Sequence, residues 1–297
     1  MSAVEALRRP APETTTAKRL RRLLRSPKGM VMVVLLGLLV LASVNESPSV
    51  VVLVASAVVS AASLDLVLVR LRRGRWAIPD GAVVSGLVVA AVLSPQEPFY
   101  VPLTAGAVAT LSKHLIRTPP RWKMHVFNPA AVALLVCILL FQSGESWWGG
   151  LADLPFYTLA VVIGAGAFIV DRINKAPQVL TFAAVYSGAL SMAAFLANGG
   201  NVHLAEAFRA PFVQAAVFFA FFMLTDPPTS PTKAGEQVEF GFVVGLAAFF
   251  CFLIVPGLAF LPLSLLIGNA WTAWRRATTP ARTPRSWQQS TRAVGET

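Results

Sequence analysis

The sequence predicts an all-α polytopic membrane protein with about ten transmembrane helices in two inverted five-helix repeats. Three observations favour this fold class. Of the 297 residues, 56% are hydrophobic and only 13% are charged, which is about half the charged fraction of an ordinary soluble domain. Mean hydropathy is accordingly high, at +0.65. Apolar segments recur along almost the whole chain, and Lys and Arg gather in the connections between them.

The predicted spans are apolar segments close to the ~20 residues that a helix needs to cross a bilayer. They lie at approximately 29–44, 49–69, 78–94, 98–116, 126–142, 154–170, 177–197, 209–225, 238–255 and 257–274. Because no Gly/Ser-rich linker separates them, we expect a single membrane domain over 28–275, with repeat halves at about 28–142 and 153–275. A basic cytoplasmic tail, 1–27, precedes this domain, and a disordered basic cytoplasmic tail, 276–297, follows it.

The distribution of basic residues predicts the orientation in the membrane. Eight Lys and Arg fall in Arg8 to Lys28, four in Arg70 to Arg75, four in Lys113 to Lys123 and five in Arg275 to Arg292. Each cluster adjoins an apolar segment, as cytoplasmic loops do. The net charge of +11 therefore indicates a lipid bilayer rather than nucleic acid as partner. We expect a multi-pass protein of the bacterial plasma (inner) membrane with both termini in the cytoplasm.

Two proline-containing helix ends suggest the internal repeat. The third span ends in Val92-Leu-Ser-Pro-Gln-Glu-Pro98, and the eighth ends in Met223-Leu-Thr-Asp-Pro-Pro-Thr-Ser-Pro231. Each places a hydroxyl residue and a proline where the helix stops, at opposite faces of the predicted membrane. Two halves with an odd number of spans insert with opposite topology, as in inverted-repeat transporters. Ordinary helix termination by proline is the alternative explanation.

Two aspartates at or near membrane depth are candidates for an ion path, because ionisable residues in spans are costly and commonly functional. Asp65 lies five residues before Arg70. It either extends toward Arg70 or Arg72 at the membrane surface or contributes to a polar cavity. Asp80 opens the third span, where it can serve as a helix N-cap or first-turn acid.

Two connections predicted on the cytoplasmic side concentrate the remaining polar residues. Asn128-Pro129 alone is an ordinary helix start, with Asn at the N-cap and Pro at the first helical position. Together, however, the two connections supply the amide, hydroxyl and ammonium donors that an anionic or flavin-like ligand needs. We therefore predict a cofactor-binding pocket formed by Lys113, His125, Phe127, Asn128, Thr225, Asp226, Thr229 and Ser230.

Other chemical signatures are missing from the sequence. It contains no Gly-rich phosphate loop and no His/Cys pattern with metal-ligand spacing, so we assign neither catalytic nor metal-binding residues. Cys137 and Cys251 lie inside apolar segments and are expected to be small buried hydrophobes. His203 is expected to be an isolated surface residue. The Trp147-Trp148 pair is expected to contact lipid or another subunit. Gly241 and Gly245 are expected where helices approach closely, and contact of their face with lipid or a subunit is the alternative.

Two stretches give the chain a family resemblance. His125-Val-Phe-Asn-Pro-Ala130 and Leu224-Thr-Asp-Pro-Pro-Thr-Ser-Pro231, with Lys113 and the span opening Asp80-Gly81-Ala-Val-Val-Ser-Gly-Leu87, resemble the RnfD/NqrB-like family. This family contains the D subunit of the Rnf electron-transport complex and the B subunit of the sodium-pumping NADH:quinone oxidoreductase. The resemblance covers roughly 28–275.

The resemblance implies a ten-helix, inverted-repeat bundle similar to urea-transporter architecture. It also implies an integral membrane subunit of a flavin-linked electron-transport system that binds FMN or riboflavin non-covalently, or a quinone, and works beside other membrane or flavoprotein subunits. In such a system the cofactor performs the chemistry and the protein supplies position and electrostatics. The chain would then be a non-catalytic subunit of an ion-translocating oxidoreductase.

The chain departs from the family at the flavin-attachment motif. The resemblance implies a Ser-Gly-Ala-Thr sequence between the fifth and sixth spans, but the connection here contains Ser143-Gly-Glu-Ser146. Ser146 is the only plausible acceptor for covalent flavin. The nearest match, Ser187-Gly-Ala-Leu190, lies inside a span and ends without a hydroxyl. A Gly-rich turn before the histidine is also replaced, by residues 118–124.

Two other functions remain open at this level. A small-molecule or ion transporter or channel on the same inverted-repeat fold, with no redox role, fits the helix breaks equally well. A scaffold without a ligand is the third possibility.

Overall fold

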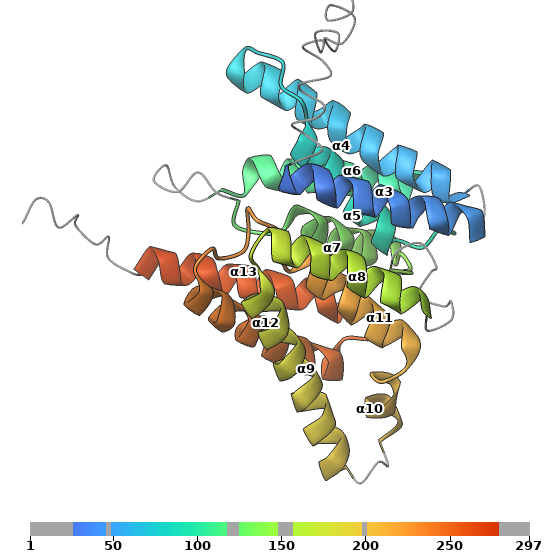
Figure 1. Ribbon diagram of the computed structural model, residues 1–297. Helices are drawn as coiled ribbons and strands as arrows, with labels where there is room; N and C mark the ends of the chain where they lie inside the picture. The colour runs from blue at the N-terminus through green and yellow to red at the C-terminus, as the bar shows by residue number, and fades with distance from the viewer. Residues whose placement is uncertain (1–25, 46–48, 118–124, 148–156, 198–200, 279–297) are drawn as a thin grey trace, which may run out of the picture.

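The computed structural model describes residues 26–45, 49–117, 125–147, 157–197 and 201–278. These residues form helices and no strands, with only two isolated backbone bridges, Leu93 with Glu145 and Arg117 with His125. The predicted all-α class is confirmed (Figure 1). The helices are α3 (Pro27–Asn45), α4 (Ser49–Arg73), α5 (Asp80–Val92), α6 (Tyr100–Leu115), α7 (Pro129–Phe141), α8 (Tyr157–Arg172), α9 (Ala176–Leu196), α10 (Val202–Glu206), α11 (Ala210–Phe218), η2 (Phe219–Met223), α12 (Ala234–Ile254) and α13 (Phe260–Thr278).

Each predicted span contains a helix, with α11 and the π-helical turn η2 together occupying the eighth. Among the described residues, α4, α9 and α12 are long and apolar enough to cross a membrane. Four further helical segments, in α3, α5, α7 and α11 with η2, are apolar but shorter. With 13 residues each, α5 and α7 rise only about 20 Å, less than the ~30 Å hydrocarbon core of a bilayer.

Several helix pairs that occupy the same order in the two halves of the chain pack on each other, although the close contact of α4 with α5 has no counterpart of similar extent in the second half. In the first half α4 packs on α6, α6 on α7 and α3 on α5; in the second half α9 packs on α12, α12 on α13 and α8 on α11 and η2. The halves meet where α7 contacts α13 and α3 contacts α8. In Figure 1, α4 and α9 lie at opposite extremes of the molecule.

Glycines allow the closest helix contacts in both halves. A Cβ on Gly106 of α6 would collide with the backbone carbonyl of Ala57 in α4, and one on Gly241 of α12 would collide with the carbonyl of Gln178 in α9. Gly245 likewise faces Phe182 and Val185 of α9. The prediction that Gly241 and Gly245 lie where helices touch is therefore confirmed, and the alternative of contact with lipid or a subunit is wrong because α9 covers this face.

An aromatic cluster joins Trp147, from the segment after α7, with rings of α9, α11 and η2. Trp147 is fully buried and contacts Phe218 and Phe219 edge to face. Phe219 packs in turn on Phe182, which stacks on Tyr186. The expectation that the Trp pair contacts lipid or another subunit is thus wrong for Trp147, which is fully buried, and Trp148 lies outside the described residues.

Candidate functional site

A cavity of about 100 Å³ lies where six helix ends meet on one face of the molecule. Its wall contains residues from the first turns of α3, α5 and α7, from the last turns of α6 and η2, and from the residue after α8. Val31, Val84 and Phe222 form part of the apolar wall. The polar side chains in the wall are Lys28, Ser85, Lys113, His125, Thr225 and Asp226.

The ammonium groups of Lys28 and Lys113 converge above Gly81, the second residue of α5. A Cβ at position 81 would lie 3.2 Å from Nζ of Lys113 and 3.9 Å from Nζ of Lys28. The absence of a side chain at Gly81 therefore leaves the space between the two cations open. The backbone N–H groups of a helix N-terminus add positive potential at the same point.

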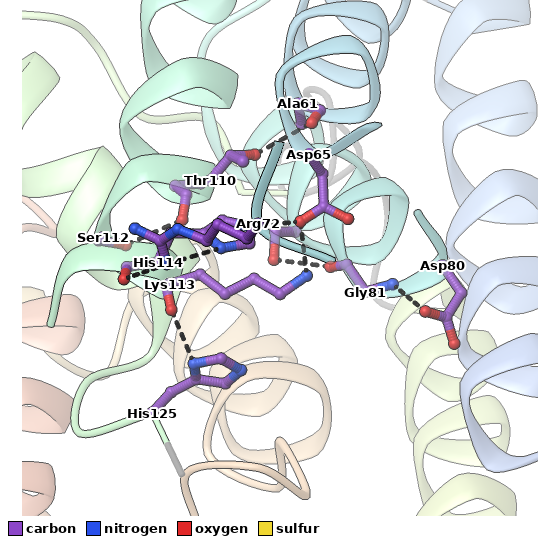
Figure 2. Close-up of polar contacts among 12 residues, drawn as sticks. Ala61, Asp65, Arg72, Asp80, Gly81, Thr110, Ser112, Lys113, His114 and His125 are labelled. Atoms are coloured by element: carbon purple, nitrogen blue, oxygen red, sulfur yellow. Dashed lines mark hydrogen bonds and ion pairs between the residues drawn. The ribbon is translucent and has the colours of Figure 1, made fainter. Parts of the chain in front are cut away.

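Lys113 is held by a buried ion network at the ends of α4 and α6 (Figure 2). Its Nζ lies 3.2 Å from Oδ1 of Asp65, which also lies 2.8 Å from Nε2 of His114. Nδ1 of His114 is 3.3 Å from Arg117 and 3.5 Å from Arg72. Because Arg can only donate, Nδ1 accepts, and the His114 proton sits on Nε2, where it is donated to Asp65. Asp65 therefore does not extend toward Arg70 or Arg72, because Lys113 and His114 surround its carboxylate.

Lys28 is paired with Asp80 at the edge of the cavity, at 3.1 Å. Oδ1 of Asp80 accepts a hydrogen bond of 2.8 Å from the N–H of Gly81. Pro79, rather than Asp80, occupies the N-cap of α5, so Asp80 is a first-turn acid. Both ion-path candidates, Asp65 and Asp80, thus position lysines, and whether an ion passes them stays a prediction.

His125 contributes a neutral imidazole to the cavity wall. Its Nδ1 donates to the backbone carbonyl of Lys113 at 3.0 Å. Burial, reinforced by the positive charges of Lys113 and Arg117, lowers the pKa of His125 to about 4. Because Nδ1 carries the proton at neutral pH, Nε2 is an acceptor in the cavity wall.

Asp226 follows η2 and brings a carboxyl group to the same cavity. Its Oδ2 accepts a 2.9 Å hydrogen bond from the hydroxyl of Thr229. Burial raises the pKa of Asp226 to about 6, although the Thr229 hydrogen bond and the charges of Lys28, Lys175 and Lys113 act in the opposite direction. This carboxyl group therefore exchanges its proton close to physiological pH.

Polar side chains at the N-terminal ends of α9 and α12 hold the backbone of the loop that carries Asp226. Gln178 donates to the carbonyl of Leu224, and Lys175 donates to the carbonyl of Pro231. Gln237 donates to the carbonyl of Thr232 at 3.1 Å. Two hydroxyl groups of the loop bond to nearby backbone. Thr225 donates to the carbonyl of Phe221, and Ser230 donates to the carbonyl of Asp226.

Asn128 joins this loop to α7 and α13. Its side chain accepts from the N–H of Ala131, which confirms the predicted N-cap, and its Nδ2 donates to the carbonyl of Met223 at 3.3 Å. The N–H of Asn128 donates to Oδ1 of Asn269 at 2.8 Å, and Nδ2 of Asn269 donates to the carbonyl of Thr229 at 3.3 Å. Asn128 therefore builds the wall behind the cavity and does not line it.

The predicted site residues separate into two groups. Lys113, His125, Thr225 and Asp226 line the cavity. The other four, which lie outside its wall, are Phe127, Asn128, Thr229 and Ser230. The sequence-based reasoning missed Lys28 and Asn269. A lone Asn in the middle of an apolar segment was the available signal for Asn269.

Two further expectations concern the opposite face. Ser146 donates to the carbonyl of Leu93 at 3.1 Å and is only partly exposed, so its hydroxyl is engaged by the fold. His203 is not isolated: its Nε2 lies 3.0 Å from the carbonyl of Phe252, and its ring stacks on that residue at 4.6 Å. The predicted surface position of His203 is confirmed, since the residue is exposed, but it is not isolated because α12 supplies both contacts.

The described residues contain no group of three or more His, Cys, Asp or Glu side chains suited to a metal ion. In comparisons with known proteins, no family model matches the chain and no curated protein is significantly similar to it.

Proposed function

We propose that the chain is an integral membrane subunit of a flavin-linked electron-transport system of the RnfD/NqrB-like type, and that its cavity binds the phosphate end of a non-covalent flavin. The observation that carries the proposal is the convergence of Lys28 and Lys113 above Gly81, at the N-terminus of α5. Two ammonium groups are donors of the kind that a phosphate requires, and the dipole of α5 adds positive potential beside them. The resemblance at His125–Ala130 and Leu224–Pro231 supports a flavin.

The size of the cavity limits which part of the cofactor it holds. At about 100 Å³, it is smaller than the ~300–1,000 Å³ of pockets that enclose whole ligands. The phosphate of FMN enters, and the isoalloxazine ring stays outside, within reach of a partner subunit. Riboflavin and a quinone lack the anionic group and gain less from the lysines.

The remaining parts of the proposal concern topology. The matching contacts of α4 with α6 and of α9 with α12 support two five-helix repeats, and the resemblance supports opposite insertion of these halves, with ten spans in all. We propose that the cavity faces the cytoplasm, and the basic residues in the last turns of α4, α6 and α13 support this orientation. Asp65 and Asp80 lie beside the lysines, where an ion path to this face would pass.

An absorbance spectrum of the detergent-purified protein between 350 and 500 nm, before and after acid precipitation, tests this function. We expect flavin bands that move to the supernatant, since no covalent attachment is proposed. Bands in the pellet would indicate covalent flavin. A protein that stays colourless after incubation with FMN contradicts the redox function.

A small-anion transporter is the second candidate, and one observation favours it. The cavity is large enough for a small anion alone, and its wall contains residues of both halves, as a site at a repeat interface would. Uptake of labelled sulfate or phosphate into liposomes containing the protein, without flavin binding, would establish this alternative.

A further inference from the structure

Asp226 is an unexpected residue in a cavity suited to an anion. Among the described residues that line the cavity, it is the only acid, and it shares the space with Lys28 and Lys113. An anion that contacts both lysines comes close to the Asp226 carboxylate in a partly buried site. The negative charges of the anion and of the Asp226 carboxylate repel each other inside one small cavity, and this repulsion favours the neutral form of the carboxyl group.

The surroundings of Asp226 permit both protonation states. In the charged state, Oδ2 accepts from Thr229, and Lys28 from α3, Lys113 from α6 and Lys175 from the turn before α9 supply positive charge. Burial opposes the charged state and raises the pKa of Asp226 to about 6. The free energy that separates the two states is therefore small near neutral pH, and a bound anion is sufficient to change which one dominates.

We infer that anion binding in the cavity is coupled to uptake of one proton by Asp226, so that the anion and the proton occupy the site together. The proton comes from solvent, forms an O–H bond on the carboxyl group and leaves when the anion leaves. This inference rests on the proposed anion site and adds to it a dependence on pH. By thermodynamic reciprocity, protonation of Asp226 increases the affinity for the anion by the same factor by which the bound anion increases the affinity of Asp226 for its proton.

His125 and Lys175, two other titratable groups near Asp226, have their titration midpoints outside the pH range in which Asp226 titrates. His125 stays neutral above about pH 5, because burial and the nearby cations lower its pKa to about 4. Burial also lowers the pKa of Lys175, to about 8, while Asp226 acts to raise it. Between about pH 5.5 and 7.5 the change in affinity is therefore assigned to Asp226.

The test is FMN affinity of the wild type and of Asp226→Asn, measured by flavin fluorescence at several values between about pH 5.5 and 7.5. The phosphate of FMN itself titrates near pH 6, but both proteins bind the same ligand, so the ratio of their affinities removes this contribution. We expect the wild-type to variant affinity ratio to fall on the order of tenfold between pH 6 and 7.5, because the wild type binds in proportion to its protonated fraction.

A second variant keeps the carboxyl group and changes only its titration. Thr229→Val removes the hydroxyl that stabilises charged Asp226, so the pH midpoint of the affinity change should move upward. Glu236→Gln is the matched control, since Glu236 pairs with Lys233 at an exposed position away from the cavity wall. It should follow the wild-type pH profile.

The outcomes separate the inference from the function on which it rests. If FMN binds and the ratio of affinities is flat with pH, the coupling is overturned and the flavin function survives. If FMN does not bind but inorganic phosphate does, with the expected change of ratio, the coupling survives and the flavin function fails. If neither probe binds, both are overturned.

Discussion

Two loops of the molecule contain the same residue types, but the acid of one loop is bonded to the backbone and the acid of the other faces a cavity. Ser94 to Glu97 follows the short helix α5, and Thr225 to Pro228 follows η2; each has a hydroxyl residue, proline and an acid. The Glu97 carboxylate accepts a 2.7 Å hydrogen bond from the N–H of Gly144, and the backbone N–H of Ser94 donates to the carbonyl of Gly144. Asp226 instead faces a cavity with two lysines.

The difference arises from what the chain packs against each loop. At the first loop the backbone of 142–147 covers the helix end, and the N–H groups of Ser146 and Trp147 both donate to the carbonyl of Val92. The Trp147 side chain of this segment is fully buried. At the second loop Gly81 leaves an open space. The segment 142–147 thus covers the helix end at the first loop, whereas at the second loop we assign the corresponding space to a ligand.

Removing the buried Trp from the covered end should have the largest effect. Trp147→Ala leaves a large void among aromatic rings, and we expect a loss of about 3–5 kcal/mol in stability. Thermal unfolding in detergent measures this loss. Trp76→Ala is the control, because Trp76 is 69% exposed. Equal losses in the two variants would show that Trp147 does not close this end.

At the open end, replacing one lysine should weaken the anion site. Lys113→Met removes one of the two cations, and we expect FMN affinity to fall about 10–100-fold, the equivalent of one charge-assisted hydrogen bond. Equilibrium titration with FMN provides the measurement. Lys233→Met, at an exposed ion pair, should bind as the wild type does. A Lys113→Met protein with unchanged affinity would remove the site.

A buried acid at the covered end should make stability depend on pH. Burial raises the pKa of Glu145 to about 8 in the folded protein, against an ordinary value near 4.3. The folded state therefore binds this proton more tightly than the unfolded state, so stability falls as pH rises from about 4.5 to 8.

Glu145→Gln should remove this dependence and make the protein more stable than the wild type at pH 8, by up to about 5 kcal/mol. Unfolding midpoints of both proteins at pH 5 and pH 8 measure the effect. Parallel changes in the two proteins would contradict the burial of Glu145.

A single methyl group tests the open space between the lysines. Gly81→Ala places a Cβ 3.2 Å from Nζ of Lys113, and this flexible side chain can move aside without unfolding the helix. We expect FMN affinity to fall about threefold to fivefold, which is about 1 kcal/mol, with an unchanged unfolding midpoint. An unaltered affinity would show that the cations do not bind a ligand between them.

The smallest effect is expected at Ser146, the only acceptor that the sequence offers for a covalent flavin, which the proposed function does not use. Ser146→Ala removes one partly exposed hydrogen bond to Leu93, so stability should fall by no more than about 1 kcal/mol. Flavin content after acid precipitation should equal that of the wild type. A selective loss of pellet flavin in this variant would establish covalent attachment at Ser146.

The helices could be located from the sequence because each apolar segment is bounded by proline, polar or basic residues. The N-cap at Asn128 was predictable for the same reason, since capping depends on neighbouring residues. Lys28 could not be assigned to the site, because nothing local indicates that the start of α3 lies beside the end of α6. The environment of Asp65 was also unpredictable, since its partners follow it by 48 and 49 positions in the chain.

Hydroxyl groups show a further limit of prediction from sequence. Thr229 and Ser230 resemble ligand donors in the sequence, but their hydroxyls bond to Asp226 within the same turn. Such local bonds compete with ligand binding. Only the loop conformation separates donors that face a cavity from donors that stabilise the loop.

The central claim is that two lysines bind the phosphate of a flavin, and comparison of FMN with riboflavin tests it most directly. Equilibrium titrations of the wild-type protein with each ligand, followed by flavin fluorescence at about pH 6, differ only in the phosphate. We predict that FMN binds at least about tenfold more tightly than riboflavin. Equal affinities, or tighter binding of riboflavin, would contradict the claim.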